Sequence, residues 1–140
     1  MTILCVDEYE LMLLTMQHML EHEGWGVEVC LNHTEALKKI EGTERYDVII
    51  LNEKLNDVSG LDILKRVRQL DHRARTPVIM FATSSSSAQA RLFGVNAVLQ
   101  KPHGIRHLVE VVTRCLREAK INPNQGEPNS QTQPKDPPEF

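Results

Sequence analysis

The feature of the sequence that most constrains its fold is a regular alternation of short apolar runs with amphipathic stretches. Between residues 1 and 120 a strand-like run is followed by a helical pattern five times. The strand-like runs are Thr2–Val6, Val27–Cys30, Asp47–Leu51, Val78–Phe81 and Ala97–Leu99. Several of them are apolar throughout, which is typical of parallel strands covered on both faces. The pattern therefore predicts an α/β domain.

The helical stretches support the same prediction. They occupy residues 9–23, 33–41, 60–70, 86–93 and 105–119. Asn32 with Glu35, and Ser59 with Asp62, have the spacing of helix N-terminal capping residues. The run Ser84–Ser87 is interpreted as a short flexible loop before the fourth helix. Five β/α units with right-handed crossovers predict a doubly wound five-stranded parallel sheet flanked by helices on both faces.

The chain is predicted to contain one domain, residues 1–120, followed by a disordered tail, residues 121–140. The tail holds five of the seven prolines, is rich in Asn and Gln, and has almost no aliphatic side chains. Such a segment cannot bury enough apolar surface to offset the loss of chain entropy on folding. The fold and its functional residues are therefore expected within residues 1–120.

Charge and composition exclude several classes of function. The formal net charge of −3, from 16 basic and 19 acidic residues, offers no basic surface for nucleic acid. There is no apolar run long enough to span a membrane, and Asp7 interrupts what would be a signal peptide. Cys5, Cys30 and Cys115 are few and scattered, as in a protein with reduced thiols. A cytoplasmic protein with neither nucleic-acid nor membrane partners is expected.

The residues that follow the predicted strands are the candidates for function, because ligands of doubly wound folds bind at the carboxyl ends of the strands. Two acids follow the first strand, an amide follows the third, a small residue and a hydroxyl follow the fourth, and a Lys-Pro pair follows the fifth. They are Asp7, Glu8, Asn52, Ala82, Thr83, Lys101 and Pro102. Their side chains are expected to meet at one edge of the sheet.

The stretches that carry these residues resemble the receiver domain of two-component response regulators, the family of the chemotaxis response regulator. The matching stretches are ILCVDE, DVIILNEKLNDVSGLDIL, TPVIMFAT and AVLQKP, and the resemblance covers about residues 2–119. It implies a flavodoxin-like fold and a part in bacterial phosphorelay signal transduction. In that family paired acids hold Mg²⁺, an aspartate after the third strand accepts a phosphoryl group, a Ser or Thr after the fourth bonds it, and a lysine neutralises it.

The chain matches this family at some positions and departs from it at others. Asp7, Glu8 and Lys101 match, and the resemblance implies a cis peptide bond between Lys101 and Pro102. The acceptor position, however, is Asn52, which has no anionic oxygen to attack phosphorus. The hydroxyl position is Ala82, with Thr83 one residue later and expected to point to the other face. The aromatic switch residue of the family is also absent.

These departures predict a degenerate receiver, or pseudo-receiver, that is not an enzyme. It is expected to be a stand-alone receiver that acts through protein–protein contacts. No cofactor is required. The amide of Asn52 removes one charge from the metal site, so Asp7 and Glu8 are expected to bind Mg²⁺ weakly or not at all. Lys101 is expected to form a salt bridge with Asp7 or Glu8 instead. The signalling partner is unknown, and the resemblance places its binding surface, or a homodimer interface, at residues 84–119 or on the first helix.

Alternatives remain open at this point. A displaced carboxylate, Asp57 or Glu53, would accept the phosphoryl group, although Glu53 directly follows Asn52 and is expected to face away from the pocket. On the first helix, residues 18–22 match the His-x-x-Glu-His pattern of a zinc peptidase group, but without a third ligand or a cleft. The same helix carries Leu13 and Leu14, which we expect to extend its apolar stripe towards solvent.

Overall fold

The computed structural model describes residues 1–56, 58–121 and 139–140. Its strands are β1 (Thr2–Val6), β2 (Gly26–Cys30), β3 (Val48–Asn52), β4 (Lys54–Leu55), β5 (Val58–Ser59), β6 (Val78–Ala82) and β7 (Ala97–Gln100). Its helices are α1 (Glu10–His22), α2 (His33–Glu41), α3 (Gly60–Gln69), α4 (Ser84–Leu92), the 3₁₀ helix η1 (His103–His107) and α5 (Leu108–Ile121). The five predicted strands and five predicted helices are all present, with small shifts at their ends.

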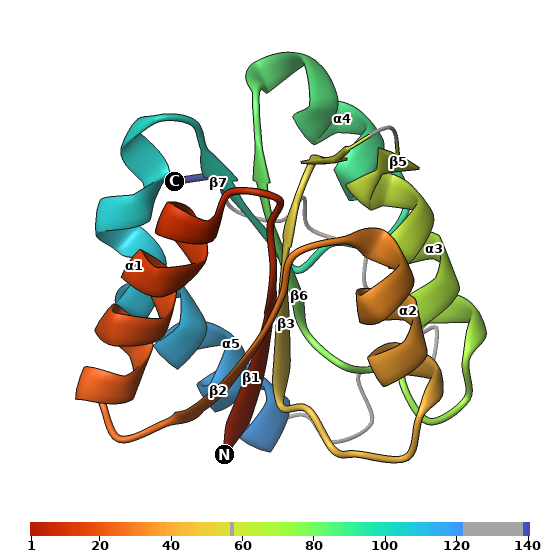
Figure 1. Ribbon diagram of the computed structural model, residues 1–140, viewed down its shortest axis with the longest axis horizontal. Coiled ribbons are helices and arrows are strands. Elements are labelled where there is room, and N and C mark those ends of the chain that lie inside the picture. The colour runs from red at the N-terminus through yellow and green to blue at the C-terminus, as the bar shows by residue number, and fades with distance from the viewer. Residues whose placement is uncertain (57, 122–138) are drawn as a thin grey trace.

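Five strands form one parallel sheet in the order β2-β1-β3-β6-β7, as predicted. Helices α1 and α5 cover one face, and α2, α3 and α4 cover the other (Figure 1). Successive strand residues alternate between the two cores: Leu4 packs beneath α2 and α3, whereas Ile3 and Cys5 pack beneath α1 and α5. Both cores are apolar, which explains why the strands lack a polar face.

The prediction for the serine run was wrong. α4 begins at Ser84, two residues earlier than expected, and Ser84–Ser87 forms its first turn. The carbonyl of Thr83 accepts hydrogen bonds from the amides of Ser86 and Ser87. Ser87 is buried and donates its hydroxyl to the carbonyl of Ser84 at 2.9 Å. The buried hydroxyl of Ser87 is therefore satisfied within the helix, which composition alone did not reveal.

The apolar stripe of α1 also differs in part from the expectation. Leu13 is buried with Met16 and Leu20 against the sheet, whereas Leu14 is 54% exposed. Only Leu14 therefore faces solvent, and exposed Leu11 adds to it from the preceding turn. The predicted cap of α2 is confirmed, because the side chain of Asn32 accepts a hydrogen bond from the amide of Glu35 at 2.9 Å.

Two features add to the predicted architecture. A short antiparallel hairpin, β4 with β5, lies between β3 and α3. At the far end of the chain, Phe140 exchanges backbone hydrogen bonds with Val98 and Gln100, and Glu139 forms an ion pair with Arg91. The C-terminus therefore lies beside the edge strand β7 (Figure 1). Most of the predicted tail, residues 122–138, lies outside the described residues.

The three cysteines all lie in the interior of the domain. Cys5, Cys30 and Cys115 are free and buried. Burial raises the pKa of Cys5 and of Cys115 to about 12, so both thiols are protonated at neutral pH. Within the described residues, no helix is long and apolar enough to cross a membrane.

Candidate functional site

The carboxyl ends of the strands enclose a cavity of about 210 Å³. It is lined by Asp7, Tyr9, Met12, Asn52, Phe81, Lys101, Pro102 and Ile105. The structure therefore brings together Asp7, Asn52, Lys101 and Pro102 of the predicted site. The apolar walls come from α1, β6 and η1, and were not among the predicted site residues. The peptide bond between Lys101 and Pro102 is cis, as the resemblance implied.

Asp7 lies directly after β1 and is buried, with 3% of its surface exposed. Its Oδ1 accepts hydrogen bonds from the backbone nitrogen of Tyr9 at 2.9 Å and from Nδ2 of Asn52 at 3.3 Å. Burial raises the pKa of Asp7 above its usual value, although the Tyr9 amide and the charge of Lys101 oppose that shift. The acid thus stands at the base of the cavity, held by two donors.

Asn52 is the last residue of β3 and has 2% of its surface exposed. Its Nδ2 also donates to the carbonyl of Lys54 at 2.9 Å, so the amide group has a defined orientation. Oδ1 of Asn52, by contrast, has no hydrogen-bond partner among the described residues. The backbone beside it is tightly packed, because a Cβ at Gly60 would lie 2.1 Å from the carbonyl oxygen of Asn52. Only glycine fits at position 60.

Glu8 is next to Asp7 in sequence but does not line the cavity. Its Oε2 accepts a hydrogen bond from the backbone nitrogen of Asn56 at 2.6 Å. Asn56 has a φ of 58°, a left-handed conformation that asparagine tolerates better than most residues. Glu8 therefore holds the turn between β4 and β5 in place. Of the two predicted acids, Asp7 faces the cavity and Glu8 faces this turn.

Lys101 does not form the predicted salt bridge with Asp7 or Glu8. Its Nζ lies 3.6 Å from Oε1 of Glu53. Glu53 does not line the cavity, as its position directly after Asn52 led us to expect, but it is 8% exposed and its carboxylate pairs with the pocket residue Lys101. The alternation of strand side chains thus extends to Glu53, whose carboxylate reaches Thr83 and Lys101 at the end of the sheet.

Ala82 and Thr83 stand at the end of β6, and neither lines the cavity. Ala82 is buried and brings no polar side-chain atom to the site. Thr83 is exposed, yet its backbone nitrogen and its hydroxyl donate to Oε2 of Glu53, at 3.1 and 3.3 Å. The Thr83 hydroxyl is therefore hydrogen-bonded to a carboxylate of the chain itself, that of Glu53. Sequence reasoning placed Glu53 only among the alternatives, and its position beside Asn52 was the available signal.

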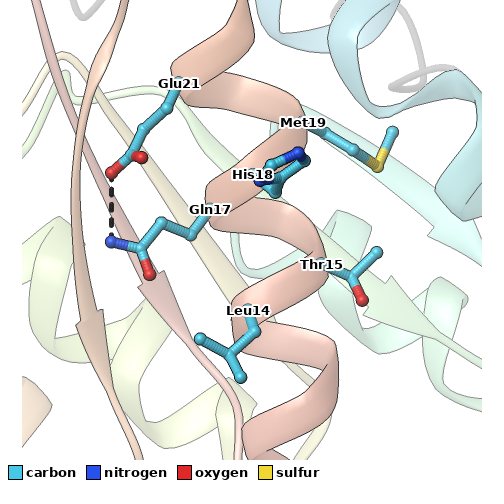
Figure 2. A pocket seen from close by; sticks show the side chains of 6 residues that line it. All are labelled: Leu14, Thr15, Gln17, His18, Met19 and Glu21. Carbon is cyan, nitrogen blue, oxygen red and sulfur yellow. Dashed lines mark hydrogen bonds between the residues drawn. The ribbon is translucent and has the colours of Figure 1, made fainter.

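The histidine-containing motif of α1 forms no metal site. His18, Glu21 and His22 are exposed, and Nε2 of Gln17 donates to Oε1 of Glu21 at 3.0 Å. Figure 2 shows Gln17 and Glu21 pointing towards each other along one side of the helix. In the described part of the chain, no group of three or more His, Cys, Asp or Glu side chains is arranged to hold a metal ion.

Two residues that line the cavity carry oxygen atoms that could hold Mg²⁺. Asp7 supplies a carboxylate, and Oδ1 of Asn52 supplies a buried oxygen without a hydrogen-bond partner. Mg²⁺ prefers such ligands, together with water. The second carboxylate, Glu8, is bonded to Asn56 instead. Asp7 and Asn52 could therefore hold the ion together with water. They would provide one negative charge, fewer than two or three free carboxylates.

Comparison with known proteins places this arrangement in a family. The model of the response regulator receiver domain matches residues 3–113. The transcriptional regulatory protein TrcR of Mycobacterium tuberculosis is 33% identical over 121 residues, 84% of this chain and 46% of TrcR. The polar-differentiation response regulator DivK of Brucella anthropi is 26% identical, over 84% of this chain and 98% of DivK.

Solved structures agree with the sequence comparisons. A CheY-like receiver domain protein from Methanospirillum hungatei superposes with a TM-score of 0.79 at 30% identity, over 86% of this chain and 97% of that one. The chain spans about half the length of the first curated relatives that it matches, 46% of TrcR among them. The family model that matches most of the chain and the shared fold lead to one conclusion: the chain belongs to the response regulator receiver domain family.

Proposed function

We propose that this receiver is a pseudo-receiver, which is not phosphorylated at Asn52 and transmits signals through protein–protein contacts. The observation that carries the proposal is the position of Asn52. Its amide occupies the end of β3, where the family has its acceptor carboxylate, and its Nδ2 is bonded to Asp7. An amide has no anionic oxygen for attack on phosphorus, and Ala82 offers no hydroxyl to bind a phosphoryl oxygen.

The alternative acceptors are less suited to the reaction. Both carboxylate oxygens of Glu53 have partners, Lys101 at one and Thr83 at the other. A nucleophile held in this way is not free to approach a phosphoryl donor in line. Asp57, the other candidate, lies outside the described residues. Phosphorylation of Glu53 or Asp57 would contradict the proposal.

The proposed partner is a signalling protein, and the proposed contact surface is formed by residues 84–119. This surface includes α4 and the edge strand β7, and Glu139 and Phe140 lie against it. Exposed Leu92 and Phe93, at the end of α4, offer apolar contact area there. A homodimer through this surface or through α1 belongs to the same proposal, as do weak Mg²⁺ binding at Asp7 and a cytoplasmic location.

The proposal is tested by the intact mass of the protein after incubation with acetyl phosphate and Mg²⁺. The parent chain is expected to gain no phosphoryl adduct, whereas Asn52→Asp is expected to gain one. Asn32→Asp is a matched control, because it adds a carboxylate at the cap of α2, at a residue that does not line the cavity. A stable phosphoryl adduct on the parent would contradict the proposal, and peptide mapping would then assign it to Glu53 or Asp57.

A further inference from the structure

The carboxylate of Glu53 lies between two groups that attract an anion. On one side Oε1 is 3.6 Å from the ammonium of Lys101. On the other, Oε2 accepts hydrogen bonds from the backbone nitrogen and the hydroxyl of Thr83, the residue before α4. An ammonium group and the backbone amides at a helix N-terminus are the groups with which proteins commonly hold a phosphoryl oxygen.

The backbone of Glu53 is fixed on both sides, which directs its side chain to this place. Its nitrogen donates to the carbonyl of Phe81 at 2.9 Å, and its carbonyl accepts from the nitrogen of Gly60 at 2.8 Å. The first bond continues the pairing of β3 with β6, and the second closes the β4–β5 hairpin. Glu53 therefore leaves the sheet at the end of β6, beside Thr83.

Other acids at this end of the sheet have different partners. Asp7 accepts from Tyr9 and Asn52, and Glu8 accepts from Asn56. Among the described residues, Glu53 is the acid that forms the ion pair with Lys101. The lysine that lines the cavity is therefore already neutralised from within the chain.

We propose that Glu53 is a built-in anionic ligand, whose carboxylate takes the place that a phosphoryl group on residue 52 would take between Lys101 and the first turn of α4. The inference rests on the proposed function, in which Asn52 carries no phosphoryl group. Glu53 then holds the start of α4 and the end of β7 together without a phosphoryl donor. The surface formed by residues 84–119 stays in one arrangement, so partner binding does not depend on phosphorylation.

The electrostatics of the site agree with a charged carboxylate at this position. Burial opposes the charged form of Glu53, but hydrogen bonds from Ser86 and Thr83 and the charge of Lys101 outweigh it, so the pKa of Glu53 is lowered. Because several donors share one acid, the interaction is stronger than an exposed ion pair, which contributes little by itself.

The first test is amide hydrogen exchange of the full chain, measured by NMR for the parent, Glu53→Ala and Glu53→Gln. Loss of the carboxylate is expected to speed exchange of the Thr83 amide by about tenfold or more in Glu53→Ala. Glu53→Gln keeps an oxygen acceptor and is expected to change it less. Glu8→Ala, which removes an adjacent acid with a different partner, should leave Thr83 unchanged. Amides of β1 report whether each variant is folded.

Unaltered exchange at Thr83 in folded Glu53→Ala would overturn the proposal. If that variant does not fold, the comparison uses Glu53→Gln and the ammonium signal of Lys101. This signal is expected to change when the charge of Glu53 is lost, and an unchanged signal would equally overturn the proposal.

A second test asks whether Glu53 blocks the place of a phosphoryl group. In Asn52→Asp the introduced carboxylate oxygen attacks the phosphorus of acetyl phosphate, and acetate leaves. Asn52→Asp combined with Glu53→Ala is expected to form the adduct about tenfold faster than Asn52→Asp alone, because a competing like charge is removed. Equal rates would overturn the inference but leave the proposed function intact. An adduct on the parent would instead defeat the proposed function.

Discussion

Asn52 donates from Nδ2 to Oδ1 of Asp7 at 3.3 Å. In a receiver with an aspartate at this position, two carboxylates would face each other here and would need a cation between them. The amide replaces that repulsion by a hydrogen bond. The folded cavity therefore does not need a metal ion to offset repulsion between Asp7 and residue 52.

Asn52→Asp is expected to make stability depend on Mg²⁺. Without the ion, the second carboxylate repels Asp7 and costs about 1–2 kcal/mol of the free energy of unfolding. Mg²⁺ at millimolar concentration is expected to restore most of that loss, because it binds the folded state alone. Thermal unfolding of both proteins with Mg²⁺ and with EDTA measures the effect. An equal Mg²⁺ shift for the parent would show that Asn52 does not weaken the site.

Removal of Glu139 and Phe140 is expected to expose the edge of β7. The backbone nitrogen of Gln100 donates to the carbonyl of Phe140, so its hydrogen exchange should accelerate by about tenfold in a chain that ends at residue 138. Glu139→Gln keeps these backbone bonds and serves as the control. If exchange at Gln100 is the same in all three proteins, the C-terminal residues do not cover β7 in solution.

Arg68→Lys is expected to destabilise the domain by about 2 kcal/mol. The guanidinium of Arg68 donates to the carbonyls of Thr76 and Gly94, among others, and thereby links α3 to the loops before β6 and β7. A lysine cannot reach these acceptors together. Arg66→Lys is the matched control, since Arg66 makes an exposed ion pair with Glu41 and should change stability by less than about 0.5 kcal/mol. Urea unfolding of the three proteins decides between these outcomes.

Tyr46→Phe is expected to make the free energy of unfolding depend less steeply on pH in acid. The buried hydroxyl of Tyr46 donates to Glu28, and this bond is the main reason that the pKa of Glu28 lies below its usual value of 4.5. Because the pKa of Glu28 is lower in the folded state, its ionised form stabilises the fold fully at a pH above the usual value of 4.5. This stabilisation is lost as the pH falls through the folded-state pKa.

Without the hydroxyl, the protein should be about 1 kcal/mol less stable at neutral pH and lose less on acidification. Chemical unfolding from pH 7 to pH 3 measures both changes. The control is Tyr9→Phe, at an exposed tyrosine whose hydrogen bond to Asp7 comes from its backbone nitrogen. If the stability of Tyr46→Phe falls as steeply between pH 7 and pH 3 as that of the parent, the bond from Tyr46 is not what lowers the pKa of Glu28.

Most of the fold could be predicted because its signals are local. The apolar residues 48–51 are buried throughout, and Asn32 caps α2 as its spacing with Glu35 indicated. The serine run before Ala88 could not be placed in this way. Its helical state depends on the burial of Ser87 and on hydrogen bonds to Thr83, which composition does not report.

The site, too, could be predicted from the sequence only in part. The order and spacing of Asp7, Asn52 and Lys101 along the chain predicted that they meet, because the ends of parallel strands share one edge of the sheet. The partner of Lys101 could not be predicted in the same way. The alternation of strand side chains predicts that Glu53 does not line the cavity, but it does not predict that the carboxylate reaches Lys101 and Thr83.

The amino-acid sequence by itself thus determined the parallel α/β architecture, the family and the identity of the residues at the strand ends. Periodicity and spacing are properties of short segments, and they are sufficient for these conclusions. Only the tertiary structure decided which charges pair, that Glu53 rather than Asp7 or Glu8 pairs with Lys101 and Thr83, and that Phe140 lies on β7. Such pairings join segments distant in sequence, and their geometry exists only once the chain has folded.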